Sequence, residues 1–476
     1  MDLNDEIESY ISEHWNQVVQ DIDTLVRIPS VEDLTAASPD APYGAQPAQA
    51  LDAALAIAQR LGLDARNCEG RIGYADLHGD SDTQIAIIGH VDVVPAGPGW
   101  AFPPFEVTRK DGYLVGRGVA DDKGPTVVAM HAAGFWQQKL KAEGRRFPYT
   151  LRMLIGANEE TGMGDVAYYR RHYNDPAFLF TPDADFPVGY GEAGICHGAL
   201  TSAPIRGGNL LELSGGVAVN AVPGEARALI ACEDAAYPQR DGIDITRGDG
   251  VIEVRAYGKS AHASTPELGV NAIDKLAAYL LDENLLSAGE RAFFELVRMV
   301  TSCSDGSAVG LQCSDDHFGD LTAVGSMIEM ERVADGSPDG AAVLRLMIDI
   351  RYPTSINSDQ IAQRINAAAA PFQAKYSISE DKPTYLMNPD SPEIQALNDA
   401  YCLITGVKAE PFALKGGTYA REFAHAASFG PEKSWESKPA WTGTIHAADE
   451  AIGEDILKQS LAIYIHAIGN LMELDL

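Results

Sequence analysis

The first 190 residues alternate between helix-length and strand-length apolar patterns, and this alternation constrains the fold more than any other feature of the chain. An apolar stripe with helical spacing begins at Ile7 and stops at Ile28, because the following proline disfavours a helix at the residue before it. Apolar runs of strand length occur at Ile85–Ile88 and Tyr149–Ile155, with a helical stretch from about Pro125 to Leu140 between them. Strands that alternate with helices predict an α/β fold whose sheet contains parallel pairs.

The middle of the chain has a different pattern, which indicates a second domain. Because 476 residues exceed one ordinary core, two domains are expected. Residues 191–382 contain short alternating runs, with clear strand candidates at Val251–Tyr257 and Ala342–Arg351. We therefore predict a two-domain, mixed-sheet α/β protein, with a discontinuous main domain at 1–190 and 383–476 and an inserted α+β lid domain at 191–382.

The composition excludes several kinds of partner. The 36 basic and 68 acidic residues give a formal net charge of −32, which repels nucleic acid and anionic membranes. The N-terminus lacks a basic segment followed by an apolar one, and no stretch approaches the roughly 20 apolar residues that cross a bilayer. The six cysteines are scattered without a C-x-x-C pair, which is typical of thiols in a reducing compartment. We expect a cytoplasmic protein.

Residues that can bind a metal ion gather at three similar points of the predicted main domain. They are His90 and Asp92 after one apolar run, Glu159 and Glu160 after another, and Asp121 and Asp122 in a glycine-bounded turn. Taken singly, such residues are commonly hydrogen-bonded core residues, solvated acids or helix caps. Together they predict a site for divalent cations outside the carboxyl ends of the strands, where open α/β sheets bind their ligands. The spacing leaves open which of the two adjacent aspartates takes part.

Five segments resemble the motifs of the di-zinc amidohydrolases, a metallopeptidase family that includes carnosinases, aminoacylases and glutamate-releasing carboxypeptidases. The segments are Gly89–Pro95, Gly116–Gly124, Asn158–Gly162, Thr181–Pro187 and Gly443–Glu450. The fourth segment is similar in particular to the PepV-type dipeptidases. The resemblance extends from His90 to Glu450 and implies a di-metal catalytic domain that carries a lid.

The resemblance implies two divalent metal ions and names the residues that would bind each ion. The expected ligands are His90, Asp121 and Asp183 for one ion, and Asp121, Glu160 and His446 for the other. Asp121 would bridge the two ions, which in such sites lie about 3.5–4 Å apart. Zn²⁺ is the first expectation, and Mn²⁺ and Co²⁺ also suit nitrogen and oxygen ligands.

Other residues of the motifs would act beside the metals. By the resemblance, Asp92 would brace the His90 imidazole, and Glu159 would take a proton from the attacking water and pass it to the leaving amine. A cis peptide bond is expected between Asp121 and Asp122.

The resemblance also assigns substrate contacts, most of them in the lid. His262, in Gly258–Pro266, and Asn220 would stabilise the oxyanion of the reaction. Arg351 would bind the carboxylate of the substrate, since its planar fork suits that group; a surface salt bridge is the plainer explanation for this arginine. The glycine-rich segment at 415–421 could equally be a plain turn. From it, the expected contacts are Gly416, Gly417 and Thr418.

These observations together predict a monomeric, metal-dependent dipeptidase that acts on small peptides, β-alanyl dipeptides among them. Two alternatives within the family are an N-acyl amino-acid deacylase and an aminopeptidase. A third alternative is a non-catalytic metal-binding homologue, which would lack a ligand or the base. The five expected ligands and Glu159 are all present in the chain.

Overall fold

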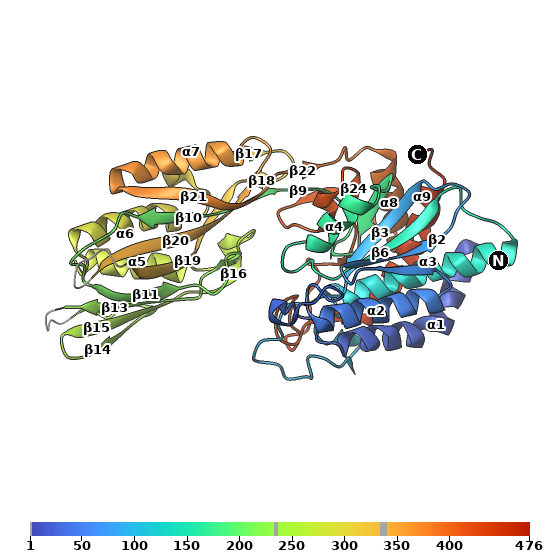
Figure 1. The fold of residues 1–476 in the computed structure, drawn as a ribbon, viewed down its shortest axis with the longest axis horizontal. Coiled ribbons are helices and arrows are strands. Elements are labelled where there is room, and N and C mark those ends of the chain that lie inside the picture. Colours follow the sequence, from blue (N-terminus) through green and yellow to red (C-terminus); the bar gives the residue numbers. More distant parts are fainter. Residues whose placement is uncertain (1, 233–236, 334–339) are drawn as a thin grey trace. The chain divides into compact units, whose positions relative to one another are not determined.

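The structure is a computed structural model that describes residues 2–232, 237–333 and 340–476, and the chain forms two compact units (Figure 1). Unit 1 comprises Met1–Gly191, Leu386–Phe412 and Gly417–Leu476, and unit 2 comprises Glu192–Tyr385 and Ala413–Gly416. The main domain predicted from the sequence differs from unit 1 at Ala413–Gly416. This segment groups with unit 2, where Lys415 Nζ donates a hydrogen bond to Asp320 O at 2.7 Å.

Unit 1 is built on a mixed sheet whose strands run in the order β1-β2-β6-β3-β7-β24-β9. These strands are β1 (Asp64–Cys68), β2 (Ile72–Leu77), β3 (Gln84–His90), β6 (Thr150–Gly156), β7 (Phe178–Thr181), β9 (Gly189–Glu192) and β24 (Ala426–Ser428). The helices are α1 (Leu3–Val26), α2 (Ala45–Arg60), α3 (Lys123–Glu143), α4 (Gly164–His172), α8 (Pro392–Thr405) and α9 (Glu454–Met472). Helix α2 packs mainly on β1 and β2 at one edge of the sheet, α3 packs on the central strands β3 and β6, and α1 and α9 pack against α3.

Smaller strand groups complete unit 1. A three-stranded sheet has the order β26-β5-β4, with β4 (Thr108–Lys110), β5 (Tyr113–Val115) and β26 (Ala451–Gly453). Strand β8 (Ala184–Asp185) pairs with β25 (Pro431–Glu432), and the 3-10 helix η5 covers Tyr419–Glu422. Strands β22 (Tyr385–Leu386) and β23 (Phe412–Leu414) lie where the chain passes between the units.

The local patterns of the sequence explain the main elements of unit 1. The apolar stripe that begins at Ile7 is the buried face of α1, whose N-cap Asp2 accepts a hydrogen bond from the Asp5 amide at 3.0 Å. The predicted strands at 85–88 and 149–155 are β3 and β6. Strand β3 is parallel to both β6 and β7, so their carboxyl ends lie at one edge of the sheet. The predicted mixed α/β fold is confirmed.

Unit 2 is an antiparallel sheet covered by helices. The sheet has the order β14-β15-β13-β11-β19-β20-β10-β21. These strands are β10 (Gly194–Ser202), β11 (Leu210–Gly215), β13 (Glu225–Ala231), β14 (Ile243–Arg247), β15 (Val251–Tyr257), β19 (Thr322–Val333), β20 (Ala341–Tyr352) and β21 (Ala374–Lys382). The helices are α5 (Ala272–Asp282), α6 (Ala288–Thr301) and α7 (Ser358–Ala369). Short strand pairs join β12 (Ala221–Val222) to β16 (Ala261–His262) and β17 (Ser314–Asp315) to β18 (Gly319–Asp320).

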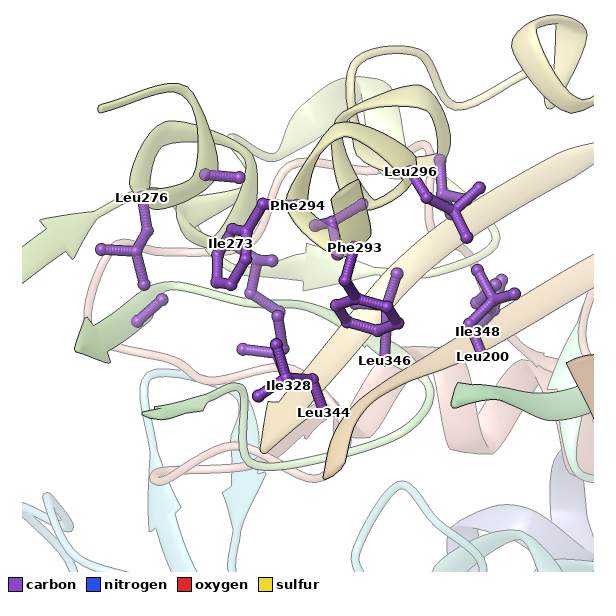
Figure 2. Close-up of a cluster of buried hydrophobic side chains, with 14 of the residues drawn as sticks. Leu200, Ile273, Leu276, Phe293, Phe294, Leu296, Ile328, Leu344, Leu346 and Ile348 are labelled. Carbon is purple, nitrogen blue, oxygen red and sulfur yellow. The ribbon is translucent and has the colours of Figure 1, made fainter. Parts of the chain in front are cut away.

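The core of unit 2 lies between this sheet and its helices. Figure 2 shows Phe293 of α6 directed toward Leu346 of β20, and Leu296 of the same helix on the side of Ile348. Side chains of a strand alternate between the two faces of a sheet, so the even-numbered positions of β20 face the helices. The odd-numbered positions of β20 face the other way. Among the residues described in both units, no helix is long and apolar enough to cross a membrane.

Candidate metal centre

The ends of three parallel strands bring most of the predicted ligands to one place. His90 is the last residue of β3, Glu159 and Glu160 follow β6 by a short turn, and Asp183 follows β7. Because β6, β3 and β7 are neighbours that run in the same direction, these side chains meet at the carboxyl edge of the sheet. This convergence is the one that the apolar runs of the sequence predict.

Asp121 and His446 reach the same place from other parts of unit 1. The turn that carries Asp121 follows β5, which belongs to the small sheet, so the expectation that all three clusters end strands of one sheet is wrong here. The peptide bond between Asp121 and Asp122 is cis, as expected. His446 lies in a loop with a φ of 61°, a left-handed conformation that residues other than glycine rarely adopt.

The distances within the cluster fit a pair of metal ions. His90 Nε2 lies 3.1 Å from Asp121 Oδ1 and 3.8 Å from Asp183 Oδ2. On the other side, His446 Nε2 lies 2.9 Å from Asp121 Oδ2 and 3.1 Å from Glu160 Oε2. Two ligands that each lie about 2.0–2.1 Å from one tetrahedral ion are about 3.3 Å apart. The two oxygens of Asp121 thus face two histidines, with the spacing that shared ions would require.

The electrostatics of the cluster also favour cations. Burial raises the pKa of Asp183 to about 7, and the neighbouring Asp121 carboxylate adds to the shift. Burial lowers the pKa of His446, but its hydrogen bonds with Asp121 and Glu160 prevail and raise it to about 11. His90 Nε2 is buried without a hydrogen-bond partner among the described residues. Carboxylates this close repel one another, and bound divalent cations would relieve the repulsion and use the imidazole lone pair.

The structure distinguishes between the adjacent aspartates Asp121 and Asp122, which the spacing in the sequence could not do. Asp122 Oδ2 accepts hydrogen bonds from the His90 backbone amide at 3.1 Å and from Thr126 Oγ1 at 2.9 Å. Asp121 instead faces His90 Nε2 and His446 Nε2. Asp122 therefore fixes the backbone of one predicted ligand, and Asp121 is placed to be a ligand.

Asp92 contacts the His90 imidazole, as expected, with both its backbone oxygen and its carboxylate near the ring. The His90 Nδ1 atom lies 3.1 Å from the backbone oxygen of Asp92, whereas the carboxylate Oδ1 is 3.4 Å away. The other carboxylate oxygen accepts a hydrogen bond from the Glu160 backbone amide at 3.0 Å. Asp92 therefore orients His90 partly through its main chain, and its side chain also holds the loop that carries Glu160.

Glu159 lies inside the cluster and not at its margin. Ligand atoms of His90, Glu159 and Asp183 all lie within 4.8 Å of one another, as do those of His90, Asp121 and Glu160. Burial raises the pKa of Glu159 well above its ordinary value, and the Asp183 and Glu160 carboxylates add to this. A carboxyl group with a raised pKa can hold a proton near neutral pH, which a proton-transfer role requires.

Two buried acids support the cluster, and sequence reasoning gave neither of them a role. Asp165 Oδ2 accepts the backbone amides of Ala157 and Asn158, at 2.8 and 3.0 Å, and the Tyr419 hydroxyl. Glu450 Oε1 accepts the amides of the Asp121 turn, and Glu450 Oε2 pairs with Arg117 at 2.6 Å. A usable signal was present for Glu450, since it closes the same motif that contains His446.

Gly156 shows how tightly the Asp165 contact is packed. A Cβ atom at this position would lie 2.0 Å from the Tyr419 hydroxyl oxygen and 2.6 Å from Asp165 Oδ2. Only glycine therefore lets the end of β6 approach this pair, and the turn that carries Glu159 and Glu160 begins from that point.

The predicted lid residues occupy defined positions within unit 2. Strands β12 and β16 pair with Ala221 opposite His262, and the Ala263 amide donates to Asn220 O at 2.9 Å, so Asn220 and His262 are neighbours. Arg351 is the residue before the last of β20 and is buried. In the glycine-rich segment, Gly416 belongs to unit 2, whereas Gly417 and Thr418 belong to unit 1. Thr418 is buried and caps η5 through the Ala420 amide.

A cavity of about 510 Å³ opens beside the cluster within unit 1. Its lining includes Asp121 and Asp183, together with Glu432 and Lys438, whose side chains pair at 2.9 Å. The loop that leads to His446 forms another wall through Ile445. The cavity is large enough for an amino-acid side chain and is directly accessible from the predicted ligands.

An α/β domain with nitrogen and oxygen ligands at the carboxyl ends of parallel strands is the architecture of a metal-dependent hydrolase. Residues 86–470 match the model of the peptidase family M20/M25/M40. The chain belongs to this family, and it is a metallopeptidase by that membership. The resemblance drawn from the sequence motifs is confirmed.

Individual relatives agree with the family. The chain is 31% identical over 488 residues to a Beta-Ala-Xaa dipeptidase of Lactobacillus delbrueckii subsp. lactis, with 99% of each chain covered. Its fold is similar to that of human carnosine dipeptidase 1, with a TM-score of 0.60, 15% identity and 100% coverage of both chains. It is equally similar to the di-peptidase Dug1p of Saccharomyces cerevisiae, with a TM-score of 0.60, 13% identity and 99% coverage of both chains.

Proposed function

We propose that this protein is a metal-dependent dipeptidase with two metal ions bridged by Asp121. The observation that carries the proposal is the placement of His90 Nε2 and His446 Nε2 on opposite oxygens of Asp121, at 3.1 and 2.9 Å. Asp183 would complete the ligand set of the first ion, and Glu160 would complete that of the second. The dipeptidase names of the relatives favour this substrate class over acylated amino acids.

Bound divalent ions would lower the pKa of a water and polarise the scissile carbonyl. Glu159 is the base in this proposal, because its carboxyl group lies within the cluster and its pKa is raised by burial. It accepts a proton from the attacking water and returns it to the nitrogen of the leaving amine. Asp92 keeps His90 and the Glu160 loop in place during these transfers.

The lid residues are proposed to bind the rest of the substrate. His262 Nδ1 accepts the Ser264 amide at 3.2 Å, so a neutral His262 carries its proton on Nε2 and can donate it to an oxyanion, with Asn220 beside it. Arg351 is proposed to bind the substrate's carboxylate, with Gly416, Gly417 and Thr418 contributing further contacts. The cavity beside Asp121 and Asp183 is proposed to hold the side chain of the N-terminal residue.

The substrate class is tested with apo-protein reconstituted with Zn²⁺, Mn²⁺ or Co²⁺ and given dipeptides, tripeptides and N-acetyl amino acids. We expect kcat/KM for dipeptides to exceed that for the matching tripeptides about tenfold or more, because in this proposal Arg351 binds the carboxylate of the residue that follows the scissile bond, and a third residue would displace that carboxylate. Zn²⁺ is expected to support this activity. Faster hydrolysis of N-acetyl amino acids would make the protein a deacylase, and hydrolysis of none of these substrates would favour a non-catalytic homologue.

We propose that the active form is a monomer in the cytoplasm. Asn220 and His262 are neighbours within unit 2, and in this proposal both act on the metal site of their own chain. The six cysteines are free thiols, which suits a reducing compartment. Light scattering during gel filtration is expected to give the mass of one chain, and kcat per chain should stay constant on dilution. A dimer whose activity falls on dilution would contradict this.

A further inference from the structure

Four charged side chains form a continuous series across three neighbouring strands of unit 2. His197 on β10 is in register with Asp349 on β20 and close to Glu380 on β21. Its Nε2 lies 2.9 Å from Asp349 Oδ2, and its Nδ1 lies 2.9 Å from Glu380 Oε2. Asp349 also pairs with Arg351, two residues further along β20. The series therefore alternates in sign from Glu380 through His197 and Asp349 to Arg351.

The inner end of this series is buried, although it lies on the face of the sheet opposite the helices. Leu344, Leu346 and Ile348 face the helices (Figure 2), so Asp349 and Arg351 face the other side. On that side Asp349 is 0% and Arg351 5% exposed. Because both side chains are buried, this pair is not the surface salt bridge that was the plainer explanation of Arg351. Charges buried in this way persist only when they are paired and hydrogen-bonded.

The hydrogen bonds of Arg351 leave a specific part of its guanidinium group available. Nε and Nη2 donate to the two oxygens of Asp349, each at 2.8 Å, and Nη1 donates to Lys415 O at 3.3 Å. A guanidinium group has five N–H donors. Within the described residues, one N–H on each terminal nitrogen is left over. Two such N–H groups, one on each terminal nitrogen, can together donate to the two oxygens of a carboxylate.

His197 lies between two carboxylates, and this fixes its charge. Each ring nitrogen faces a carboxylate oxygen, so both bonds can form only when both nitrogens carry a proton. Burial acts to lower the pKa of His197, but the hydrogen bonds with Asp349 and Glu380 prevail and raise it. The imidazolium shares the charge of Asp349 with Arg351, so Arg351 is not fully neutralised by its own partner.

We propose that His197 and Asp349 are positioning residues for substrate recognition: they hold Arg351 so that its two remaining N–H groups and its residual positive charge meet the carboxylate of the substrate. This rests on the proposed dipeptidase function and adds to it. Asp349 sets the orientation of the guanidinium, and His197 sets how much of its charge Asp349 cancels. Without His197, Asp349 and Arg351 would form a neutral pair with a weaker attraction for an anion.

The test compares alanyl-leucine with its C-terminal amide as substrates of the metal-loaded full-length protein. In His197→Gln we expect KM for alanyl-leucine to rise about tenfold with kcat nearly unchanged, since a hydrogen bond between charged groups is lost. KM for the amide should not change. Asp349→Asn should raise KM for alanyl-leucine further, because it removes one of the two carboxylate oxygens that accept hydrogen bonds from Arg351. Glu380→Gln, at the 45% exposed end of the series, should raise it least.

Glu329→Gln is the matched control, because Glu329 on β19 pairs at 3.7 Å with Arg345 on β20 and, among the described residues, forms no ion pair with the series. Thermal unfolding of each variant shows whether it is folded. If Asp349→Asn does not fold, the KM values of His197→Gln and Glu380→Gln test the proposed positioning role. Equal changes in KM for acid and amide, or none, would overturn the inference. If the wild-type protein cleaves acid and amide equally well, the role of Arg351 fails while the peptidase activity stands; if it cleaves neither, the proposed function itself fails.

Discussion

Glu159→Gln is expected to lower kcat for dipeptides by about 10²–10⁴-fold, the usual contribution of a general base. The amide keeps the shape of the side chain but cannot accept and return a proton. Because Asp121, Glu160, Asp183 and both histidines are unchanged, the protein should still bind two ions per chain. The measurements are steady-state kinetics and metal content after dialysis, so that loss of chemistry is separated from loss of metal.

The matched control for this substitution is Glu8→Gln, an exposed glutamate of α1 in the same unit. It should leave kcat, KM and metal content unchanged. Two results would contradict the assignment of Glu159. If Glu159→Gln lost one ion, Glu159 would be a ligand, which its position near His90 and Asp183 also allows. If it kept its activity, the base would have to be another group.

The strand ends explain why much of the metal centre could be predicted from the sequence. A strand with an uninterrupted apolar run, such as Ile85–Ile88, is recognisable locally, and the residue that follows it must lie at the edge of the sheet. His90 and Glu160 follow this rule. The motif resemblance was needed to identify Asp183 and His446, and to choose Asp121 over Asp122 in a turn that follows a strand of the small sheet.

The supporting residues were not predictable for a physical reason. Asp165 and Tyr419 are 254 positions apart, and their hydrogen bond exists only once α4 and η5 have come together. Asp92 contacts His90 through its backbone oxygen and the Glu160 amide through its carboxylate, and the second contact likewise depends on the position of the Glu160 loop. Periodicity reports which face of an element is buried, whereas such contacts depend on how distant elements are arranged. Ala413–Gly416 group with unit 2 for the same reason, through the contact of Lys415 with Asp320.

The buried pair of Arg117 and Glu450 links two loops of the metal centre across the chain. Arg117 is 1% and Glu450 0% exposed. Glu450 Oε1 accepts the amides of Gly118, Ala120 and Asp121, at 2.9, 3.0 and 3.3 Å, and Glu450 follows His446 by four residues. Burial raises the pKa of Glu450 to about 7, with Asp121 adding to the shift and Arg117 opposing it. Removing Arg117 therefore favours a protonated Glu450, which is a poorer acceptor for these amides.

Arg117→Met is expected to lower the free energy of unfolding by about 3–5 kcal/mol, the usual cost of leaving one member of a buried ion pair without its partner. Urea unfolding with and without Zn²⁺ measures this cost, and the stabilisation by Zn²⁺ should also shrink, because the Asp121 turn and the His446 loop lose their common anchor. Arg66→Met, which breaks an exposed pair at 3.9 Å, should cost at most about 1 kcal/mol. In Arg117→Met/Glu450→Gln the buried charge is gone, so part of the stability should return. If Arg117→Met cost no more than Arg66→Met, the pair would not be the anchor of the two loops.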